Sequence, residues 1–125
     1  MPKPFAPVLV VEDDRELQDS LADVLGEAGF EVVAAEDGLR ALRYLQSHPA
    51  PCVVLLDLMM PGMDGFELRR RMLADPNLAC IPVVVTTALS HDFRSRDRLR
   101  ARAYLHKPFD MAALLDVVRQ CGEDP

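Results

Sequence analysis

The chain has 125 residues, of which 50% are hydrophobic and 27% are charged, and its formal net charge is −6. This size and composition fit one globular domain with a substantial core and exclude a disordered chain. The acidic balance argues against general binding to nucleic acid or to anionic membranes. No apolar run approaches the roughly 18 residues of a membrane-spanning helix. Segment 1–7, with three prolines, lacks the layout of a signal peptide, so we expect a cytoplasmic protein.

Apolar runs and helical periodicity alternate along the chain. Short apolar runs predict five strands, at 8–11, 30–35, 52–56, 81–85 and 103–106. Apolar residues at helical spacing follow four of these runs, at 17–28, 41–45, 68–73 and 111–118. The expected stops are Gly29, Pro49, the Asp75-Pro76-Asn77 turn and Gly122. At the start of the third helix, Asp64 and Glu67 have the spacing of a reciprocal capping box.

The stretch 90–102 has the weakest pattern, because its arginines fall on alternate positions from Arg94 to Arg102. We expect a short or irregular fourth helix there. Six basic residues and two acids between His91 and Lys107 give a local charge of +4, which suits either a partner-facing patch or a solvated helix face. We expect the leader 1–6 and the tail 122–125 to be flexible.

Five alternations of strand and helix predict an α/β fold, in which a doubly wound parallel sheet of five strands carries five helices on its two faces. The whole chain, 1–125, would form this single domain. Cys52, Cys80 and Cys121 are odd in number and widely spaced, which favours reduced core thiols over disulfides or a metal cluster. The three histidines share no ligand spacing either.

Polar residues stand where the predicted strands end. Glu12 and Asp13 follow the first strand, and Asp57 follows the third; Thr87 follows the fourth strand and Lys107 the fifth. In the flavodoxin-like strand order 2-1-3-4-5, strands one and three are neighbours, and ligands bind at the carboxyl edge of the sheet. Three carboxylates would then crowd one pocket, which needs more positive charge than one lysine supplies. Oxygen ligands without histidine or cysteine predict Mg²⁺.

A metal ion, a carboxylate, a hydroxyl and a lysine together can stabilise a phosphoryl group as it moves onto an oxygen. Asp57 is the candidate nucleophile, because carboxylates form aspartyl-phosphates. Glu12 and Asp13 would hold the metal directly or through water. Lys107 and Thr87 would each contact a phosphoryl oxygen.

Each of these residues also has a simpler structural interpretation. Asp13 or Asp14 could only cap the first helix, and Thr87 could only cap the fourth. Lys107 could be a surface lysine whose aliphatic chain covers apolar residues. Their joint placement at successive strand ends favours a functional site.

Four motifs that span most of the chain make it resemble the receiver domains of bacterial two-component response regulators. They are VLVVEDD at 8–14, LLDLMMPGMDG at 55–65, VVVTTA at 83–88 and YLHKPF at 104–109. The resemblance implies that Asp57 accepts a phosphoryl group from the phosphohistidine of a sensor histidine kinase or phosphotransfer protein. It also implies that Mg²⁺ is bound by Glu12, Asp13, Asp57 and the backbone carbonyl of Met59, with Lys107 beside the phosphoryl group.

By the same resemblance, Thr87 and Tyr104 form a switch pair. Phosphorylation would draw the Thr87 hydroxyl inward and let Tyr104 rotate into the core. The surface of the fourth helix, fifth strand and fifth helix would then change, and a second copy or a downstream protein could bind there. We expect no direct contact with nucleic acid or membrane.

The sequence departs from the family pattern near this surface. Residues 100–102 read Arg-Ala-Arg where a glycine-led turn is common, and Thr86 occupies a position that is usually apolar. Met59 and Leu89, two residues past Asp57 and Thr87, are apolar and cannot orient a water molecule. We therefore predict slow autodephosphorylation.

Three other functions are weighed against this one. A phosphohydrolase of the haloacid dehalogenase type needs a second acid where this chain has Met59. A nucleotide-binding module needs a glycine-rich loop, and the first strand is followed by Glu-Asp-Asp instead. A phosphorylation-independent interaction module stays open because of the unusual arginine segment.

Overall fold

One parallel sheet of five strands forms the centre of the molecule, with the strand order β2-β1-β3-β4-β5 that the sequence predicts. The computed structural model describes residues 6–88 and 99–123. The strands are β1 (Val8–Val11), β2 (Val32–Ala35), β3 (Val53–Asp57), β4 (Val83–Thr87) and β5 (Ala103–His106). The helices of the described ranges are α1 (Arg15–Glu27), α2 (Gly38–Ser47), α3 (Gly65–Ala74) and α5 (Met111–Glu123).

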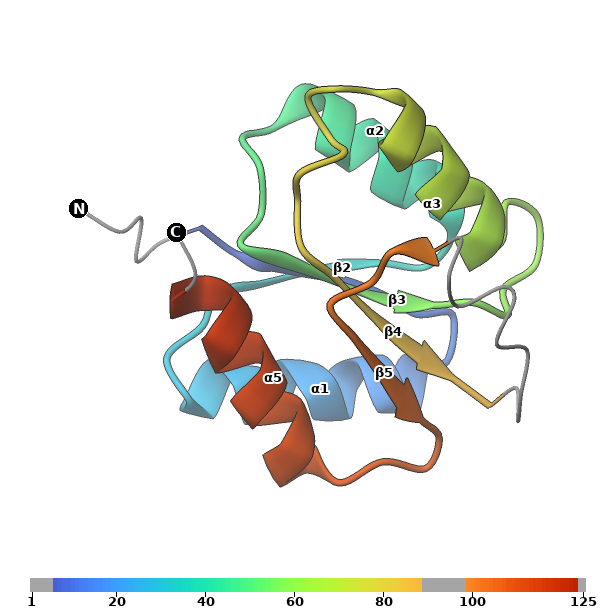
Figure 1. Cartoon of the computed structure of the whole chain (residues 1–125). Coiled ribbons are helices and arrows are strands. Elements are labelled where there is room, and N and C mark those ends of the chain that lie inside the picture. The colour runs from blue at the N-terminus through green and yellow to red at the C-terminus, as the bar shows by residue number, and fades with distance from the viewer. Residues whose placement is uncertain (1–5, 89–98, 124–125) are drawn as a thin grey trace.

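The helices cover both faces of the sheet, as a doubly wound fold requires. Figure 1 shows α2 and α3 on one face and α1 and α5 on the other. The irregular fourth helix that we predict, most of the arginine run, and segments 1–5 and 124–125 lie outside the described residues. Within residues 6–88 and 99–123, no helix is both long and apolar enough to cross a lipid bilayer.

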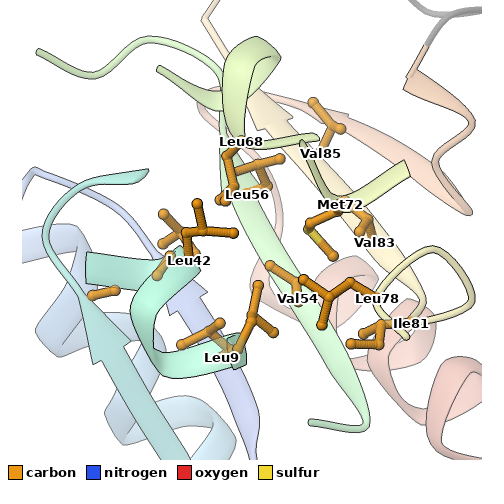
Figure 2. Close-up of a cluster of buried hydrophobic side chains, with 14 of the residues drawn as sticks. Leu9, Leu42, Val54, Leu56, Leu68, Met72, Leu78, Ile81, Val83 and Val85 are labelled. Atoms are coloured by element: carbon orange, nitrogen blue, oxygen red, sulfur yellow. The ribbon is translucent and has the colours of Figure 1, made fainter. Parts of the chain in front are cut away.

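Two hydrophobic layers hold the fold together, one on each face of the sheet. In the first, Leu9, Val54 and Leu56 of the sheet pack with Leu42 of α2 and with Leu68 and Met72 of α3 (Figure 2). The second joins strand residues such as Val10 and Leu55 to α1 and α5. Every residue of β1 and β3 is buried, which explains why these strands read as continuous apolar runs.

Several strand boundaries differ from the prediction. The sequence places the start of the second strand at Phe30, but β2 begins at Val32. The reason is that the Phe30 N–H donates to the Leu25 carbonyl (3.0 Å) in the turn that ends α1 at Gly29, where φ is 96°. Strands β3 and β4 are displaced by one and two residues from the predicted runs, so that β3 covers Val53–Asp57 and β4 covers Val83–Thr87. Hydrophobicity marks burial, whereas the ladder continues through the polar residues Asp57, Thr86 and Thr87.

Two helix predictions are also wrong in part. Helix α5 continues through Gly122 to Glu123, because glycine stops a helix only where it leaves helical geometry, as Gly29 does. Asp64 caps α3 by accepting from the Glu67 N–H (2.9 Å), as expected. The reciprocal half of the capping box is wrong, because the Glu67 carboxylate instead pairs with two arginines that follow it on the helix, Arg70 and Arg71.

All three cysteines are thiols outside any disulfide, as predicted. Their burial is only partly as predicted, since Cys121 is buried and Cys52 is half-buried but Cys80 is exposed. Cys80 is therefore not a core thiol: it lies in the turn between α3 and β4 and not in the strand that follows.

Candidate functional site

The carboxylates of Glu12, Asp13 and Asp57 come together at the carboxyl edge of the sheet. Each offers an oxygen atom, and these oxygens all lie within 4.8 Å of one another. The sheet causes this, because β1 and β3 are parallel neighbours whose last paired residues are Val11 and Leu56. The residues that follow this pair must therefore meet at the same edge.

The acids in the loop between β1 and α1 have different roles. Asp14 is the N-cap of α1 and accepts from the N–H groups of Glu16 (3.0 Å) and Leu17 (3.3 Å). Its own N–H donates to Glu12 Oε2 (3.2 Å). Asp14 therefore meets the helix's need for a cap, and Asp13 is left exposed beside the other two carboxylates.

Gln18 of α1 holds the loop between β1 and α1 in place through a hydrogen bond. Its side chain is buried, and its amide Nε2 donates to the backbone carbonyl of Glu12 (3.1 Å). Gln18 was not predicted as part of the site. Its sequence position could have identified it, because Gln18 follows Leu17 directly and places a polar side chain on the otherwise apolar, inward face of the helix.

Lys107 connects the acids from the opposite side of the site. Its ammonium Nζ lies 2.6 Å from Glu12 Oε1 and 3.4 Å from Asp57 Oδ2. Its backbone N–H donates to the Thr87 carbonyl (2.7 Å), and this bond fixes the chain just after β5 against the end of β4. The cis peptide bond Lys107–Pro108 follows.

The electrostatics of the site follow from burial. Glu12 is only 2% exposed, and burial raises its pKa to about 7 although the Lys107 hydrogen bond acts to lower it; the Asp57 charge adds to the rise. Burial alone would lower the pKa of Lys107, but its hydrogen bond to Glu12 and the charge of Asp57 outweigh that effect and raise it. The single positive charge of Lys107 therefore does not fully neutralise the three carboxylates of the site.

Asp57 is the last residue of β3 and is 3% exposed. Its Oδ1 accepts from the Met59 N–H (3.1 Å), while its Oδ2 faces Lys107. The carboxylate is therefore held in one orientation, and the exposed side chain of Met59 lies directly after it in the loop.

Gly65 lets α3 begin directly against this strand end. A Cβ atom at position 65 would lie 2.4 Å from the Asp57 carbonyl oxygen and 2.7 Å from the Leu58 Cα, and the Gly65 N–H donates to the Leu58 carbonyl (3.1 Å). Only glycine fits this close approach of two backbones. Gly65 lies within the motif at 55–65, but this role was not predicted from the sequence.

Thr87 and Tyr104 lie on the neighbouring strands β4 and β5. Thr87 is the half-buried last residue of β4, one position beyond the buried Thr86. Tyr104 pairs with Val85 across the ladder and is half-buried against the layer that contains α2 and α3. Leu89, the second apolar residue of the autodephosphorylation prediction, lies outside the described residues.

The donor set fits a hard divalent cation. Three carboxylate oxygens converge, no histidine or cysteine takes part in this group, and burial disfavours the charge of Glu12 unless a cation compensates it. Mg²⁺ is commonly held in proteins by one or two carboxylates together with water and phosphate oxygens.

This fold and this site define a doubly wound α/β protein that carries three carboxylates and a lysine at the carboxyl edge of its sheet. Residues 8–119 match the response regulator receiver domain family. The chain therefore belongs to that family, the signalling domains of two-component systems.

Known proteins from several bacteria resemble the chain. The DNA-binding dual master transcriptional regulator RpaA of Synechocystis is 35% identical over 90% of this chain, which spans 47% of RpaA. Protein PilH of Pseudomonas aeruginosa is 33% identical over 91% of this chain and 95% of its own length. The receiver domain of the sensor histidine kinase PA1611, from the same organism, was solved with a magnesium ion in its active site cleft. It is 27% identical, has a TM-score of 0.84, and the match covers 94% of this chain and 98% of that one.

Proposed function

We propose that this receiver domain accepts a phosphoryl group on Asp57 from the phosphohistidine of a sensor histidine kinase or of a phosphotransfer protein. The observation that carries the proposal is the placement of the buried Asp57 carboxylate, which is fixed between the Met59 N–H and the Lys107 ammonium beside Glu12 and Asp13. A carboxylate at the open edge of the sheet can be reached by a donor, because α/β folds bind ligands at this edge.

Glu12, Asp13, Asp57 and the backbone carbonyl of Met59 would hold Mg²⁺. When bound, the ion would supply the positive charge that stabilises phosphoryl oxygens during transfer. The magnesium ion in the active site cleft of the PA1611 receiver domain supports this assignment, as does the converging set of three acids in this chain.

In the transfer, a carboxylate oxygen of Asp57 forms a bond to phosphorus while the bond from phosphorus to the imidazole nitrogen of the donor breaks. The imidazole leaves and takes up a proton. Lys107 would move its ammonium from Glu12 toward a phosphoryl oxygen, and the Thr87 hydroxyl would donate to another. The products are an acyl phosphate on this chain and a free histidine on the donor, so the domain turns over no external substrate.

The phosphoryl group would act on the rest of the domain through Thr87 and Tyr104. Moving the Thr87 hydroxyl toward the phosphate leaves space that the Tyr104 ring can fill, which changes the surface near β5 and α5. This surface is where a downstream protein or a second copy would bind. We place the protein in the cytoplasm, the usual location of this family, and assign this domain no direct contact with nucleic acid or membrane.

Intact-mass measurement after incubation with Mg²⁺ and acetyl phosphate tests the proposal. The wild type should gain the mass of one phosphoryl group, and Asp57→Asn should not, because its amide is not a nucleophile. Asp19→Asn, an exposed position on α1, is the matched control and should gain the group normally. An adduct on Asp57→Asn, or phosphate release over many turnovers, would contradict the proposal.

The same experiment measures the lifetime of the phosphoryl group. The Met59 side chain is 56% exposed beside Asp57 and apolar, so it offers no group to orient an attacking water. After removal of acetyl phosphate, the adduct should persist for minutes or longer. A half-life of seconds would show that water is activated by other groups.

A further inference from the structure

Arg69 of α3 is a buried arginine that the phosphorylation site does not use. The residue is only 3% exposed. Its Nε donates to the Leu99 carbonyl (2.7 Å) and its Nη2 to the Arg100 carbonyl (3.2 Å). Figure 1 shows α3 beside the orange segment that begins at Leu99. The guanidinium therefore ties α3 to the chain segment that leads into β5.

The charge of Arg69 is not paired with an acid in the part of the chain that the structure describes. Within residues 6–88 and 99–123, its third nitrogen Nη1 is buried and has no hydrogen-bond partner. A buried guanidinium without a carboxylate is unfavourable for folding, and an apolar side chain of similar size would fill the same space at lower cost. The residue therefore calls for a role other than packing.

The segment that Arg69 holds determines where Tyr104 lies. Leu99 is helical, Arg100 lies in a turn with a φ of 50°, and the chain joins the sheet where the Arg102 N–H donates to the Val83 carbonyl (2.8 Å). Tyr104 follows two residues later and pairs with Val85. The turn at residues 99–100 therefore lies directly before the strand that carries Tyr104.

Arg69 and Tyr104 are also close in space. Leu99, Ala101 and Tyr104 pack into the same hydrophobic layer. Burial is the main influence on Arg69 and lowers its pKa, while the neighbouring Tyr104 acts in the opposite direction. The guanidinium and the phenol thus lie within electrostatic range on the α3 side of the sheet.

We propose that Arg69 is a positioning residue for Tyr104: two of its nitrogens fix the turn before β5, and Nη1 is the donor that the phenol oxygen meets when the ring is buried. The switching part of this proposal rests on the proposed function, in which Tyr104 responds to phosphorylation of Asp57. In this arrangement Arg69 favours the buried position of Tyr104. It thereby strengthens the coupling between the phosphorylation site and β5.

The chain offers a clean probe, because it contains only two tyrosines. Incorporation of 3-fluorotyrosine gives two ¹⁹F NMR signals, one from Tyr104 and one from Tyr44. Tyr44 lies on α2 and stacks on His48 with a centroid distance of 4.2 Å, so it reports on folding away from β5. Arg69→Met removes the donors and keeps an unbranched side chain. Arg70→Met is the matched control, because the Arg70 side chain is 71% exposed on the same helix.

Without phosphate, Arg69→Met should shift or broaden the Tyr104 signal and leave that of Tyr44 in place, whereas Arg70→Met should change neither. With Mg²⁺ and acetyl phosphate, Arg69→Met should still form the adduct, but its ratio of buried to exposed Tyr104 should fall by about five-fold or more relative to the phosphorylated wild type. If Arg69→Met fails to fold, Arg69→Lys replaces it. That variant keeps the charge but cannot reach both carbonyls and the phenol, so the same changes are expected.

Identical Tyr104 signals in wild type and Arg69→Met, before and after phosphorylation, would overturn the inference and leave the proposed function intact. If the wild type forms no adduct by mass, the proposed function fails. The comparison without phosphate then still decides whether Arg69 positions Tyr104. The two failures are therefore distinguishable.

Discussion

Glu12 is the residue at which a proton and the proposed Mg²⁺ would compete most directly. Its pKa rises from the ordinary value of 4.5 to about 7, chiefly because the carboxyl is buried. A raised pKa means that the folded state binds the proton more tightly than the unfolded state does. The stabilisation is therefore complete below pH 4.5 and is lost as the pH rises through 7. It amounts to at most about 3 kcal/mol.

The raised pKa of Glu12 predicts how the stability of the protein depends on pH. In magnesium-free buffer, the wild type should lose thermal stability between pH 5 and pH 8 relative to Glu12→Gln, whose amide does not titrate. Added Mg²⁺ should raise the Tm of the wild type more at pH 8 than at pH 5, because the ion competes with the proton on Glu12. Differential scanning fluorimetry across this pH range measures both effects. Equal pH profiles for the two proteins would show that Glu12 is already ionised at pH 5.

The residues that could be predicted from the sequence are defined by their position at strand ends, whereas those that could not are defined by their side-chain contacts. Glu12, Asp57 and Lys107 could be predicted because each stands at a strand end, and parallel strands bring their carboxyl ends to one edge. Gln18 and Arg69 could not, because their roles depend on which backbone carbonyl their side chains meet. For Arg69 that partner lies 30 residues away in sequence, and no local pattern predicts such a contact.

At the scale of elements, the junction between β3 and α3 controls how Asp57 is presented. Gly65→Ala should destabilise the fold by about 1–3 kcal/mol, because the new Cβ would meet the Asp57 carbonyl and the Leu58 Cα at distances that real contacts do not allow. The helix must move away from the strand end, so phosphorylation by acetyl phosphate should also slow. Urea unfolding and intact-mass time courses measure the two effects.

Gly26→Ala is the control for this substitution. A Cβ at Gly26, in α1, would have nothing within 4 Å, so alanine there should stabilise the helix by about 0.5–1 kcal/mol and leave phosphorylation unchanged. If Gly65→Ala behaves like Gly26→Ala, then the contact between the start of α3 and the end of β3 does not control the site.

The order of the helices and strands could be predicted from the sequence, whereas some of their boundaries could not. Strands β1 and β5 begin and end where the apolar pattern does, because turns or polar residues bound them directly. Strand β2 starts late because the N–H of Phe30 is used by the turn after α1. Hydrophobic periodicity indicates which residues are buried, whereas element boundaries depend on where each backbone N–H finds its acceptor.

For the whole molecule, the order of the strands divides the sheet into a rigid centre and two edges. Strands β1 and β3 have neighbours on both sides and are buried on both faces. Strand β5 pairs only with β4, and its residues are half-buried or exposed. The phosphoacceptor Asp57 thus belongs to the centre, whereas Tyr104 belongs to an edge. This division suits the switch that we propose, because β5 can open without unfolding the strand that carries the proposed phosphoacceptor.

Amide hydrogen exchange should show this division directly. Amides of β3 should exchange only through global unfolding, so their protection should fall with denaturant as steeply as the global free energy of unfolding. Amides of β5 should exchange through a smaller opening with a shallower denaturant dependence, because fewer buried contacts are lost. Exchange measured by NMR at increasing guanidinium concentrations separates the two. Equal protection and equal slopes for β3 and β5 would mean that the sheet opens as one unit, and a switch at Tyr104 would then have to act by side-chain rotation alone.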